Sequence, residues 1–405
     1  MRGAKVVNVA ILGYGTVGSG VYDVITRNNS HIGRRAGKDI NVKYVLDLRE
    51  FPGDPAEKIL VHDFDTILND DDVDIVVEVM GGVEPAHTFV KNALLRGKSV
   101  CTSNKEMVAK FGAELLEIAK EKNSNFVFEA SVGGGIPVIR SINESLTVDH
   151  FDEISGILNG TTNYILTKMD KEGLAFDAVL KDAQDKGYAE RNPEADIEGY
   201  DACRKIAILA SLCYEKQVDF EDIYTEGITK ISSEDFAYAR KLGYSIKLLG
   251  TARKIDGKVY AMVAPFMLDE ENPLHSVSGV FNAIKMHGDM LGNVMLYGKG
   301  AGKHATASAV VSDVIDCARN LGHNKIVYWS PEKRTLGDID TFTTKFFVRV
   351  KGVVDKAALE EQFGGVTLVS GIENETAFIT EEISEAKYKK AAENFEVINK
   401  IRISK

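Results

Sequence analysis

A short apolar strand that runs directly into a glycine turn and then an amphipathic helix is the feature that most constrains the fold. Residues 6–12 read VVNVAIL, and residues 19–29 read SGVYDVITRNN with helical periodicity. Between them lies the spacing G-x-G-x-x-G, whose glycines allow a tight turn, approach of the backbone to a pyrophosphate, and packing of helix on strand. The expected cofactor-binding residues of this turn are Gly13, Gly15, Thr16, Val17 and Gly18.

Strands and helices alternate through the first 140 residues, which is typical of a Rossmann-type doubly wound sheet in an α/β fold. We therefore predict a dinucleotide-binding domain over residues 1–140. Ligands of such sheets bind beyond the carboxyl ends of the strands, where Thr102, Ser103 and Lys105 would lie. Strands are expected over 41–48, 71–82, 98–105 and 125–131, and helices over 85–96 and 106–123.

Two charged residues after the second expected strand bear on the choice of cofactor. Asp47 would accept a hydrogen bond from a ribose hydroxyl of NAD, whereas Arg49 would favour the additional phosphate of NADP. Because both are present, the sequence predicts a cofactor-binding role for Arg49 and leaves NADP or NAD open.

The composition excludes some classes of partner. A net charge of -11 argues against a nucleic-acid partner, because phosphate backbones require a basic surface. No apolar stretch reaches the length of a membrane span, and the N-terminus runs into a strand and does not resemble a signal peptide. The four scattered cysteines, without zinc-like spacing, indicate reduced thiols and a cytoplasmic location.

The pattern changes after the first domain. Residues 141–340 are expected to form an α+β catalytic and oligomerisation domain with a mixed open sheet. The polar run NGTTN suggests pocket lining by Gly160 and Thr161, and the competing interpretation is a helix N-cap at Thr161 or Thr162. The expected strands are 154–166, 258–268, 281–289 and 293–300, and the expected helices include 176–186 and 308–322.

A dense run of charges lies between Tyr188 and Lys205, with the pattern P-x-x-D-I-x-G-x-D-x-x-x-K. Asp201 and Lys205 are four residues apart, so on a helix their charged groups share one face. The apolar run that follows places this lysine at the rim of a core, where its pKa can shift and it can take part in proton chemistry.

This run resembles the homoserine dehydrogenase family, with Gly187, Tyr188, Pro193, Asp196, Gly199, Asp201 and Lys205 at the expected places. The resemblance implies reduction of L-aspartate 4-semialdehyde to L-homoserine by a nicotinamide cofactor. Lys205 would transfer the proton and Asp201 would orient it. The remaining implied roles are contact with nicotinamide and substrate by Lys105, cofactor contacts at Gly187 and Gly302, and binding of the substrate ammonium by Glu190 and Asp196.

Three glycines and a proline crowd the segment 128–139 (FEASVGGGIPVI). From the residues alone this is a tight interdomain turn. The family resemblance implies a structural sodium ion bound here, held by Glu129, Val132, Gly134 and Ile136. Gly133 stands where the family usually has alanine.

Residues 345–405 follow the order β-α-β-β-α-β, which resembles a ferredoxin-like ACT regulatory domain. The resemblance raises threonine as a possible effector. Ala357 and Ala358 replace the glycine that such ligand loops usually carry, so a module that only pairs chains is the alternative.

Two other functions remain open at this point. One is another Rossmann-type dehydrogenase acting on an amino acid semialdehyde, and the other is a non-catalytic sensor of nucleotide and amino acid. We expect a small-molecule substrate and a homodimer or homotetramer.

Overall fold

The computed structural model describes residues 6–404, which form two compact units. Both units are discontinuous in the sequence, and the division into domains 1–140, 141–340 and 345–405 stays a prediction. Within the described residues, the first unit comprises 6–148, 207–220 and 298–334, and the second comprises 149–206, 221–297 and 335–404.

The first unit is built on a six-stranded parallel sheet in the order β3-β2-β1-β4-β5-β6. This is the order of a doubly wound nucleotide-binding sheet, so that part of the fold prediction is confirmed. The expected strand over 125–131 is shorter than predicted, because a 3₁₀ turn begins at Glu129. The strands are β1 (Val7–Leu12), β2 (Ile40–Leu46), β3 (Leu60–Val61), β4 (Val73–Glu78), β5 (Ser99–Thr102) and β6 (Phe126–Val127).

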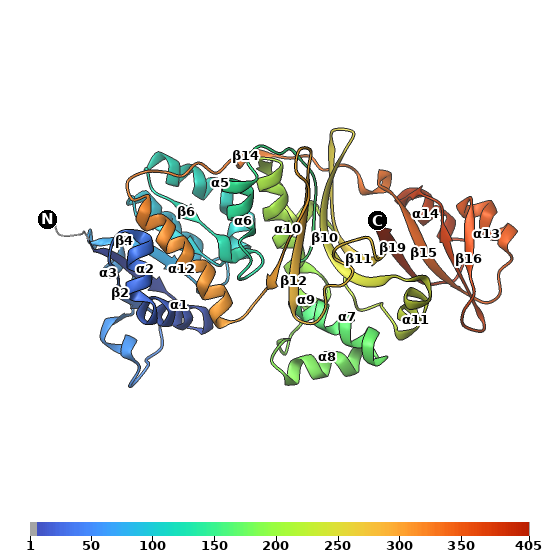
Figure 1. The fold of residues 1–405 in the computed structure, drawn as a ribbon, viewed down its shortest axis with the longest axis horizontal. Coiled ribbons are helices and arrows are strands. Elements are labelled where there is room, and N and C mark those ends of the chain that lie inside the picture. The colour runs from blue at the N-terminus through green and yellow to red at the C-terminus, as the bar shows by residue number, and fades with distance from the viewer. Residues whose placement is uncertain (1–5, 405) are drawn as a thin grey trace. The chain divides into compact units, whose positions relative to one another are not determined.

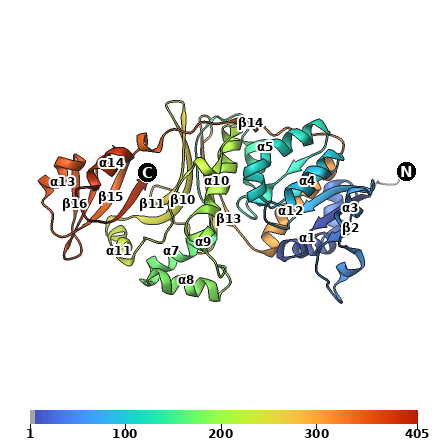
Figure 2. The same ribbon diagram turned by 180° about the vertical axis from the view of Figure 1, so that it is seen from behind.

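Helices cover both faces of this sheet. α1, α2 and α12 pack together on one face (Figure 1), and α4 and α5 lie on the other (Figure 2). α12 comes from late in the chain, yet its apolar side chains share a core with those of β1 and α1. The helices are α1 (Thr16–Arg27), α2 (Asn29–Ala36), α3 (Phe64–Leu68), α4 (Ala86–Leu95), α5 (Lys105–Glu121), α6 (Val138–Arg140) and α12 (Lys303–Arg319), with β8 (Lys216–Gln217) paired to β14 (Ser330–Lys333) nearby.

The second unit contains one large mixed sheet in the order β13-β12-β7-β10-β11-β19-β15-β17-β16. Its centre is the long antiparallel hairpin of β10 and β11, closed by Asp256 and Gly257, both with positive φ. The strands are β7 (Phe151–Ile157), β9 (Tyr224–Thr225), β10 (Ser245–Ile255), β11 (Lys258–Leu268), β12 (Phe281–Gly288), β13 (Gly292–Lys299), β15 (Thr343–Lys351), β16 (Val366–Val369), β17 (Glu375–Thr380), β18 (Ile383–Ser384) and β19 (Val397–Ser404).

The strand expected over 154–166 is wrong beyond Ile157, because the chain turns into α7 at Gly160. The alternative of a helix N-cap is confirmed in kind, but the capping residue is Asn159, whose side chain accepts from the Thr162 N–H at 2.9 Å. The helices of this unit are α7 (Gly160–Glu172), α8 (Phe176–Asp185), α9 (Glu194–Ile197), α10 (Tyr200–Cys213, whose last turns belong to the first unit), α11 (Ser233–Leu242), α13 (Lys356–Phe363) and α14 (Glu385–Ala392).

Residues 343–404 have the predicted order of elements, with the short β18 in addition. Their strands pair in the order β19-β15-β17-β16, around a core that includes Phe346, Phe363 and Phe378. β19 also pairs in parallel with β11, so this module extends the sheet of the second unit.

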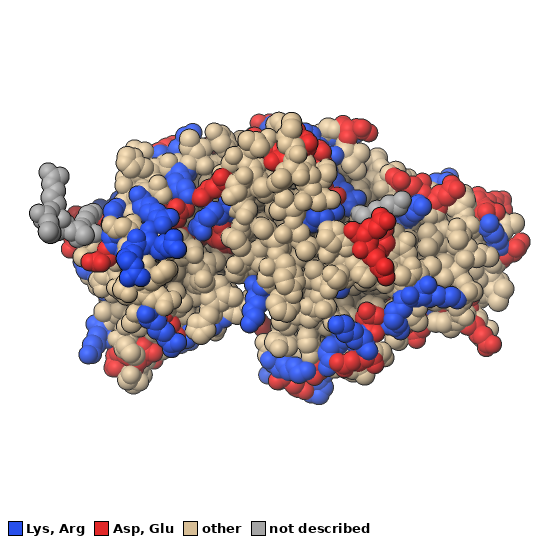
Figure 3. All heavy atoms as spheres, in the orientation of Figure 1, with Lys and Arg blue, Asp and Glu red and all other residues tan. Residues whose placement is uncertain are grey.

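Figure 3 shows charged side chains of both signs on this face, with few of them over its middle, and the chain as a whole carries a net charge of -11. Within residues 6–404, no helix combines the length and apolar composition that a membrane span requires.

Candidate active site

The glycine turn after β1 has the backbone that a dinucleotide needs. Gly13 has a φ of +95°, a conformation that L side chains rarely adopt. A Cβ on Gly18 would lie 1.9 Å from the carbonyl oxygen of Gly13, so this position excludes any side chain. A Cβ on Gly15 would meet nothing within 4 Å, which leaves open space at the turn. α1 begins at Thr16, and the N–H groups of its first turn, including that of Val17, suit a phosphate.

Asp47 is tied to this turn and to Arg49. Its carboxylate accepts the backbone N–H of Tyr14 at 2.8 Å and both Nε and a terminal nitrogen of Arg49 at 2.9 Å. The Arg49 guanidinium, together with backbone donors, holds the pKa of the Asp47 carboxyl well below its usual range despite partial burial. The Arg49 side chain remains 62% exposed. A carboxylate and a guanidinium therefore both lie beside the glycine turn.

Lys105 is the first residue of α5, and the preceding residues fix where that helix starts. The Asn104 side chain accepts from the Met107 N–H at 3.1 Å and so caps the helix. The Thr102 hydroxyl accepts the Asn104 N–H at 2.9 Å. Thr102, Ser103 and Lys105 thus lie at the carboxyl end of β5, where the sequence placed them.

Glu78 is a buried acid at the end of β4 that the sequence interpretation missed. It accepts the Thr102 hydroxyl at 2.6 Å and the Met80 N–H at 2.8 Å. Burial raises its pKa, although these hydrogen bonds act in the opposite direction. The signal in the sequence was an acid directly after the apolar run 75–77 at the end of the strand. Glu78 holds Thr102, and through it the start of α5.

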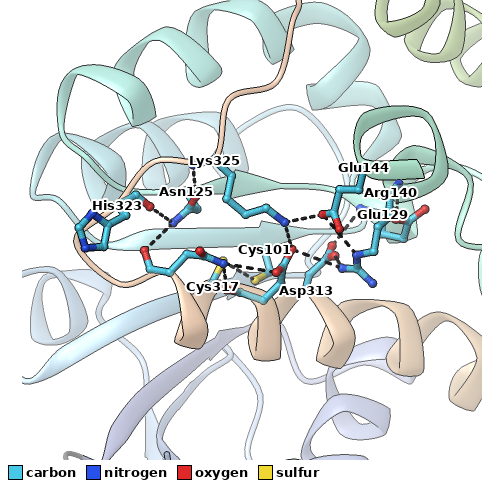
Figure 4. A network of polar contacts seen from close by, with 11 residues as sticks. Cys101, Asn125, Glu129, Arg140, Glu144, Asp313, Cys317, His323 and Lys325 are labelled. Carbon is cyan, nitrogen blue, oxygen red and sulfur yellow. Dashed lines mark hydrogen bonds and ion pairs between the residues drawn. The ribbon is translucent and has the colours of Figure 1, made fainter. Parts of the chain in front are cut away.

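The glycine-rich segment is anchored to α12 by charged groups (Figure 4). The Glu129 carboxylate accepts the N–H groups of Ile139 and Arg140, each at 2.8 Å. Asp313 of α12 accepts the Glu129 N–H at 2.9 Å and the Arg140 guanidinium at 2.8 Å. Burial raises the pKa values of both Glu129 and Asp313. The segment is therefore fixed to the helix that returns from late in the chain.

In the glycine-rich segment, the oxygen atoms available to a cation are mainly main-chain carbonyl oxygens. Both carboxylate oxygens of Glu129 are occupied by backbone N–H groups, and the carbonyls of Glu129 and Ile136 each accept one further backbone N–H. Gly134 has a φ of +57°, and a Cβ there would lie 2.4 Å from the Gly300 carbonyl oxygen. Within residues 6–404, no group of three or more His, Cys, Asp or Glu side chains is arranged to hold a metal. With the Glu129 carboxylate engaged, the carbonyls of Glu129, Val132, Gly134 and Ile136 are the oxygens left for a cation, and binding of one stays a prediction.

Gly302 caps α12 with a φ of +121°. A Cβ on Gly20 of α1 would lie 3.0 Å from Lys303, so the start of α12 packs closely on α1. Lys303 also pairs with Asp23 of α1 at 2.9 Å. Gly302 therefore lies in the same compact unit as the glycine turn.

In the second unit, three charged side chains gather around Asn159. Its amide nitrogen donates to Asp196 at 2.7 Å and to Asp201 at 2.8 Å. Asp201 also accepts the Lys205 ammonium at 2.7 Å, and Lys205 donates to the Leu158 carbonyl at 2.8 Å. The side chains of Asp201 and Lys205 are only 7% and 12% exposed. The predicted pair is thus a nearly buried one, joined to a second acid by an amide that the sequence did not single out.

The other residues predicted to bind substrate or cofactor in this unit differ in their contacts. The Thr161 hydroxyl donates to the Tyr188 carbonyl at 2.6 Å and so holds the loop after α8. A Cβ on Gly160 would lie 2.8 Å from the Val280 carbonyl oxygen. Gly187 follows the C-cap residue of α8 and has a φ of +72°. Glu190 is exposed, and its main-chain carbonyl accepts from the Gln184 side-chain amide at 3.1 Å.

These residues can perform acid–base chemistry on a polar substrate. An ammonium fixed by one carboxylate and one carbonyl has a remaining donor for a substrate oxygen. The nearby acid Asp196 can bind a cationic group. Lys105 belongs to the first unit and Lys205 to the second, so a pocket shared by the two lysines stays a prediction.

Comparisons with known proteins point to one family. The chain matches the homoserine dehydrogenase family over residues 137–315 and the NAD binding domain of homoserine dehydrogenase over residues 13–129. It is 38% identical to a homoserine dehydrogenase of Synechocystis over 431 aligned positions, covering 98% of this chain and 97% of that protein. These matches favour homoserine dehydrogenase over the other interpretations left open by the sequence.

Solved structures agree. A crystal structure of homoserine dehydrogenase from Thiobacillus denitrificans superposes with a TM-score of 0.91 at 34% identity, over 100% of this chain and 99% of that one. A hyperthermophilic archaeal homoserine dehydrogenase mutant in complex with NADPH gives a TM-score of 0.65 at 31% identity, over 77% of this chain and 97% of that one. The glycine turn, the lysine–carboxylate cluster and these matches together place the chain in the homoserine dehydrogenase family, as an NAD(P)-dependent oxidoreductase.

Proposed function

We propose that Lys205 is the proton donor and acceptor in the interconversion of L-aspartate 4-semialdehyde and L-homoserine. The observation that carries this proposal is the fixed position of the Lys205 ammonium, 2.7 Å from Asp201 and 2.8 Å from the Leu158 carbonyl. Two acceptors on a nearly buried ammonium define its direction and leave one N–H for the substrate.

When bound, the nicotinamide cofactor supplies or accepts hydride at the carbon that carries the reacting oxygen. Lys205 gives a proton to that oxygen as negative charge develops in reduction, and takes it back in oxidation. Asp201 orients the ammonium, and Asn159 keeps Asp201 in place. Lys105, at the start of α5, is proposed to contact the substrate and the nicotinamide.

The amino acid end of the substrate carries an ammonium that needs carboxylate partners. Asp196 is the first candidate, because its carboxylate lies beside the Asn159 amide at 2.7 Å. Glu190 remains a second candidate, since its exposed position leaves its carboxylate available to a bound ligand. Gly160 and Thr161 are proposed to line the same site.

Replacement of Lys205 tests the central assignment. Lys205→Ala should lower kcat by about 10²–10⁴-fold, the usual contribution of a positioned acid–base group. Cofactor affinity, measured by nucleotide fluorescence, should change by less than about twofold, because binding of the nucleotide does not use this proton. Lys168→Ala, a helix lysine paired with Asp182 at 3.1 Å in the same unit, is the matched control and should retain activity. A Lys205→Ala enzyme with most of its turnover would remove Lys205 from this role.

For the cofactor, we propose that either NAD or NADP is accepted. The adjacent Asp47 and Arg49 support this, since the first suits a ribose hydroxyl and the second suits a 2′-phosphate. The archaeal homoserine dehydrogenase that superposes on this chain was solved with NADPH. The discriminating measurement is the ratio of kcat/KM values for the two nucleotides.

A structural sodium ion is proposed at the glycine-rich segment, held by main-chain oxygens of Glu129, Val132, Gly134 and Ile136. The occupied carboxylate of Glu129 supports a role for its carbonyl rather than its side chain. An ion here would order the turn between β6 and α6 and take no part in the chemistry.

The C-terminal module is proposed to be an ACT-like domain with threonine as effector. The ferredoxin-like strand order β19-β15-β17-β16 supports the ACT-like fold. Ala357 and Ala358 in α13 stand where related ligand loops carry glycine, so threonine binding requires direct measurement.

A homodimer or homotetramer is proposed from the edge strand β13. Its Met295 and Tyr297 are 39% and 53% exposed, and an uncovered apolar edge favours pairing with a second chain. Light scattering on the purified protein measures the oligomeric state. The cytoplasmic location stays a prediction from the sequence.

A further inference from the structure

Three donors converge on one carboxylate oxygen of Glu226, which follows β9. They are the Tyr224 hydroxyl at 3.0 Å, the Lys400 ammonium at 2.9 Å and the Arg402 guanidinium at 2.9 Å. Lys400 and Arg402 belong to β19, the last strand of the C-terminal module, and Arg402 is 1% exposed. Arg402 also pairs with the buried Glu385 at 2.5 Å. Lys400 and Arg402 of the C-terminal module therefore hold the carboxylate of Glu226, which lies in the same second unit as the Asn159 cluster.

Glu226 is ionised at neutral pH. Burial opposes its charge, but the Lys400 and Arg402 charges outweigh that effect and lower the pKa of its carboxyl to about 2. Burial likewise works against the charge on Arg402, yet Glu385 and Glu226 raise its pKa. Because the charges of Glu226 and Glu385 balance those of Lys400 and Arg402, loss of one partner would leave buried charge uncompensated.

The residues directly after Glu226 pack on the turn that ends α9. The Ile228 N–H donates to the Ile197 carbonyl at 2.8 Å. A Cβ on Gly227 would lie 2.2 Å from that same carbonyl oxygen and 2.6 Å from the Glu198 Cα, so the two backbones are in direct contact. Any shift of Glu226 is therefore transmitted to residues 197–198 without an intervening flexible side chain.

That turn carries Asp196 on one side and leads into α10 on the other. The Gly199 N–H donates to the Asp196 carbonyl at 3.0 Å, and a Cβ on Gly199 would lie 3.0 Å from the Val263 side chain and 3.3 Å from that of Thr225. The Asp196 carboxylate then meets the Asn159 amide at 2.7 Å. A continuous set of contacts thus leads from β19 to the acid proposed to bind the substrate ammonium.

We propose that Lys400 and Arg402, acting through Glu226, are positioning residues that set the place of Asp196 in the substrate site. The proposal rests on the substrate role of Asp196 given under Proposed function. In this proposal the C-terminal module helps to position a substrate-binding residue, whether or not the module binds an effector. A network that only fastens β19 to the sheet would affect stability and leave substrate affinity alone.

The test compares KM for homoserine and kcat, at saturating nucleotide, for five variants. Lys400→Met removes one of the two cations on Glu226 and should raise KM about fivefold with kcat within about twofold, in the range of couplings carried by packed networks. Gly227→Ala leaves every charge in place but pushes on the Ile197 carbonyl, and should raise KM by at least as much. Lys400→Arg keeps the cation and should restore KM to within about twofold of the parent enzyme.

Two further variants separate the possible failures. Lys351→Met removes a lysine of the same module that pairs with Glu396 at 2.8 Å, where both side chains are more than 60% exposed, and should change neither constant. Asp196→Asn should raise KM for homoserine strongly. Thermal unfolding of each variant, followed by circular dichroism, shows which proteins are folded under assay conditions.

The outcomes are distinct. If Asp196→Asn raises KM while folded Lys400→Met and Gly227→Ala enzymes keep the parent KM, the positioning proposal is overturned and the substrate role of Asp196 stands. If Asp196→Asn leaves KM unchanged, the proposed substrate role is wrong and the positioning proposal falls with it. A rise of KM in Lys400→Met and Gly227→Ala, reversed in Lys400→Arg and absent in Lys351→Met, supports the proposal.

Discussion

The side-chain amide of Asn159 donates to the Asp201 carboxylate at 2.8 Å while its carbonyl oxygen caps α7. One residue therefore links the start of a helix to the carboxylate that orients Lys205. The two tasks use opposite ends of the amide, so they can be separated by substitution.

Asn159→Ser should separate capping from positioning. Serine is a good N-cap, so the change of capping residue alone should lower the free energy of unfolding by less than about 0.5 kcal/mol. Loss of the amide donor leaves Asp196 and Asp201 without their shared partner, and kcat/KM for homoserine should fall about tenfold or more. Denaturant unfolding and steady-state kinetics measure the two effects. Equal loss of stability and activity would argue that Asn159 serves only the helix.

Arg49→Ala should change the preference between nucleotides. Removal of the guanidinium takes away a partner for a 2′-phosphate, so KM for NADP should rise about tenfold. KM for NAD should stay within about twofold, because Asp47 still lies beside the ribose position. The assay is homoserine oxidation with each nucleotide. An equal rise of KM for NADP and for NAD would show that Arg49 supports the glycine turn and does not bind the 2′-phosphate.

Exchange of sodium for choline should lower the thermal midpoint of the enzyme if the glycine-rich segment holds the ion. Binding of a ligand to the folded state alone stabilises that state by an amount that grows with the logarithm of the ligand concentration, so the midpoint should rise with sodium at constant ionic strength. Gly134→Ala is the matched variant, because its Cβ would collide with the Gly300 carbonyl and disturb the ring of oxygens. A thermal midpoint of the parent enzyme that does not change with sodium concentration would contradict a sodium site at this segment.

Threonine should inhibit the intact protein if the C-terminal module is a sensor. Homoserine oxidation with and without millimolar threonine, together with calorimetric titration, tests this directly. The alanines at 357 and 358 make weak binding the expected result, because they add side chains where a ligand would approach the backbone. Unchanged activity combined with no measurable heat would assign the module a structural role alone.

Stability should rise with pH above pH 8 because of Lys247. This β10 lysine is 6% exposed and donates to the Val277 carbonyl at 2.6 Å, and burial lowers the pKa of its ammonium to about 8. Between pH 8 and the unfolded value near 10.5 the unfolded chain binds more protons, so this group raises the free energy of unfolding by about 1.4 kcal/mol per pH unit. Lys247→Met should remove that slope in denaturant titrations, and a persistent slope would assign it to other groups.

The parts of the fold that follow local patterns were predictable. The glycine turn specifies its own strand and helix, and the i, i+4 spacing of Asp201 and Lys205 correctly anticipated their contact. The strand expected through NGTTN failed because the Asn159 cap competes with strand pairing at that point. β10 was missed because its buried run includes Lys247 and Gly250 and shows no alternation.

Part of the site could not be predicted from the sequence, because its residues meet only through long-range contacts. Asn159 is 37 residues from Asp196 and 42 from Asp201, and no periodic pattern connects such distant positions. Lys400 and Arg402 are 174 and 176 residues from Glu226, on a strand whose alternation looks like that of any half-buried strand. Only the folded backbone brings these groups together.

The return of α12 to the first sheet has a consequence for synthesis of the protein. During translation, the nucleotide-binding sheet emerges with one face still lacking Ala307, Val310 and Val314, which complete its core. The 175 residues from 128 to 302, between β6 and α12, must be made before that face is covered. The nascent chain therefore carries an exposed apolar surface for many seconds at ordinary ribosome speeds, and a fragment ending near residue 140 should aggregate rather than fold.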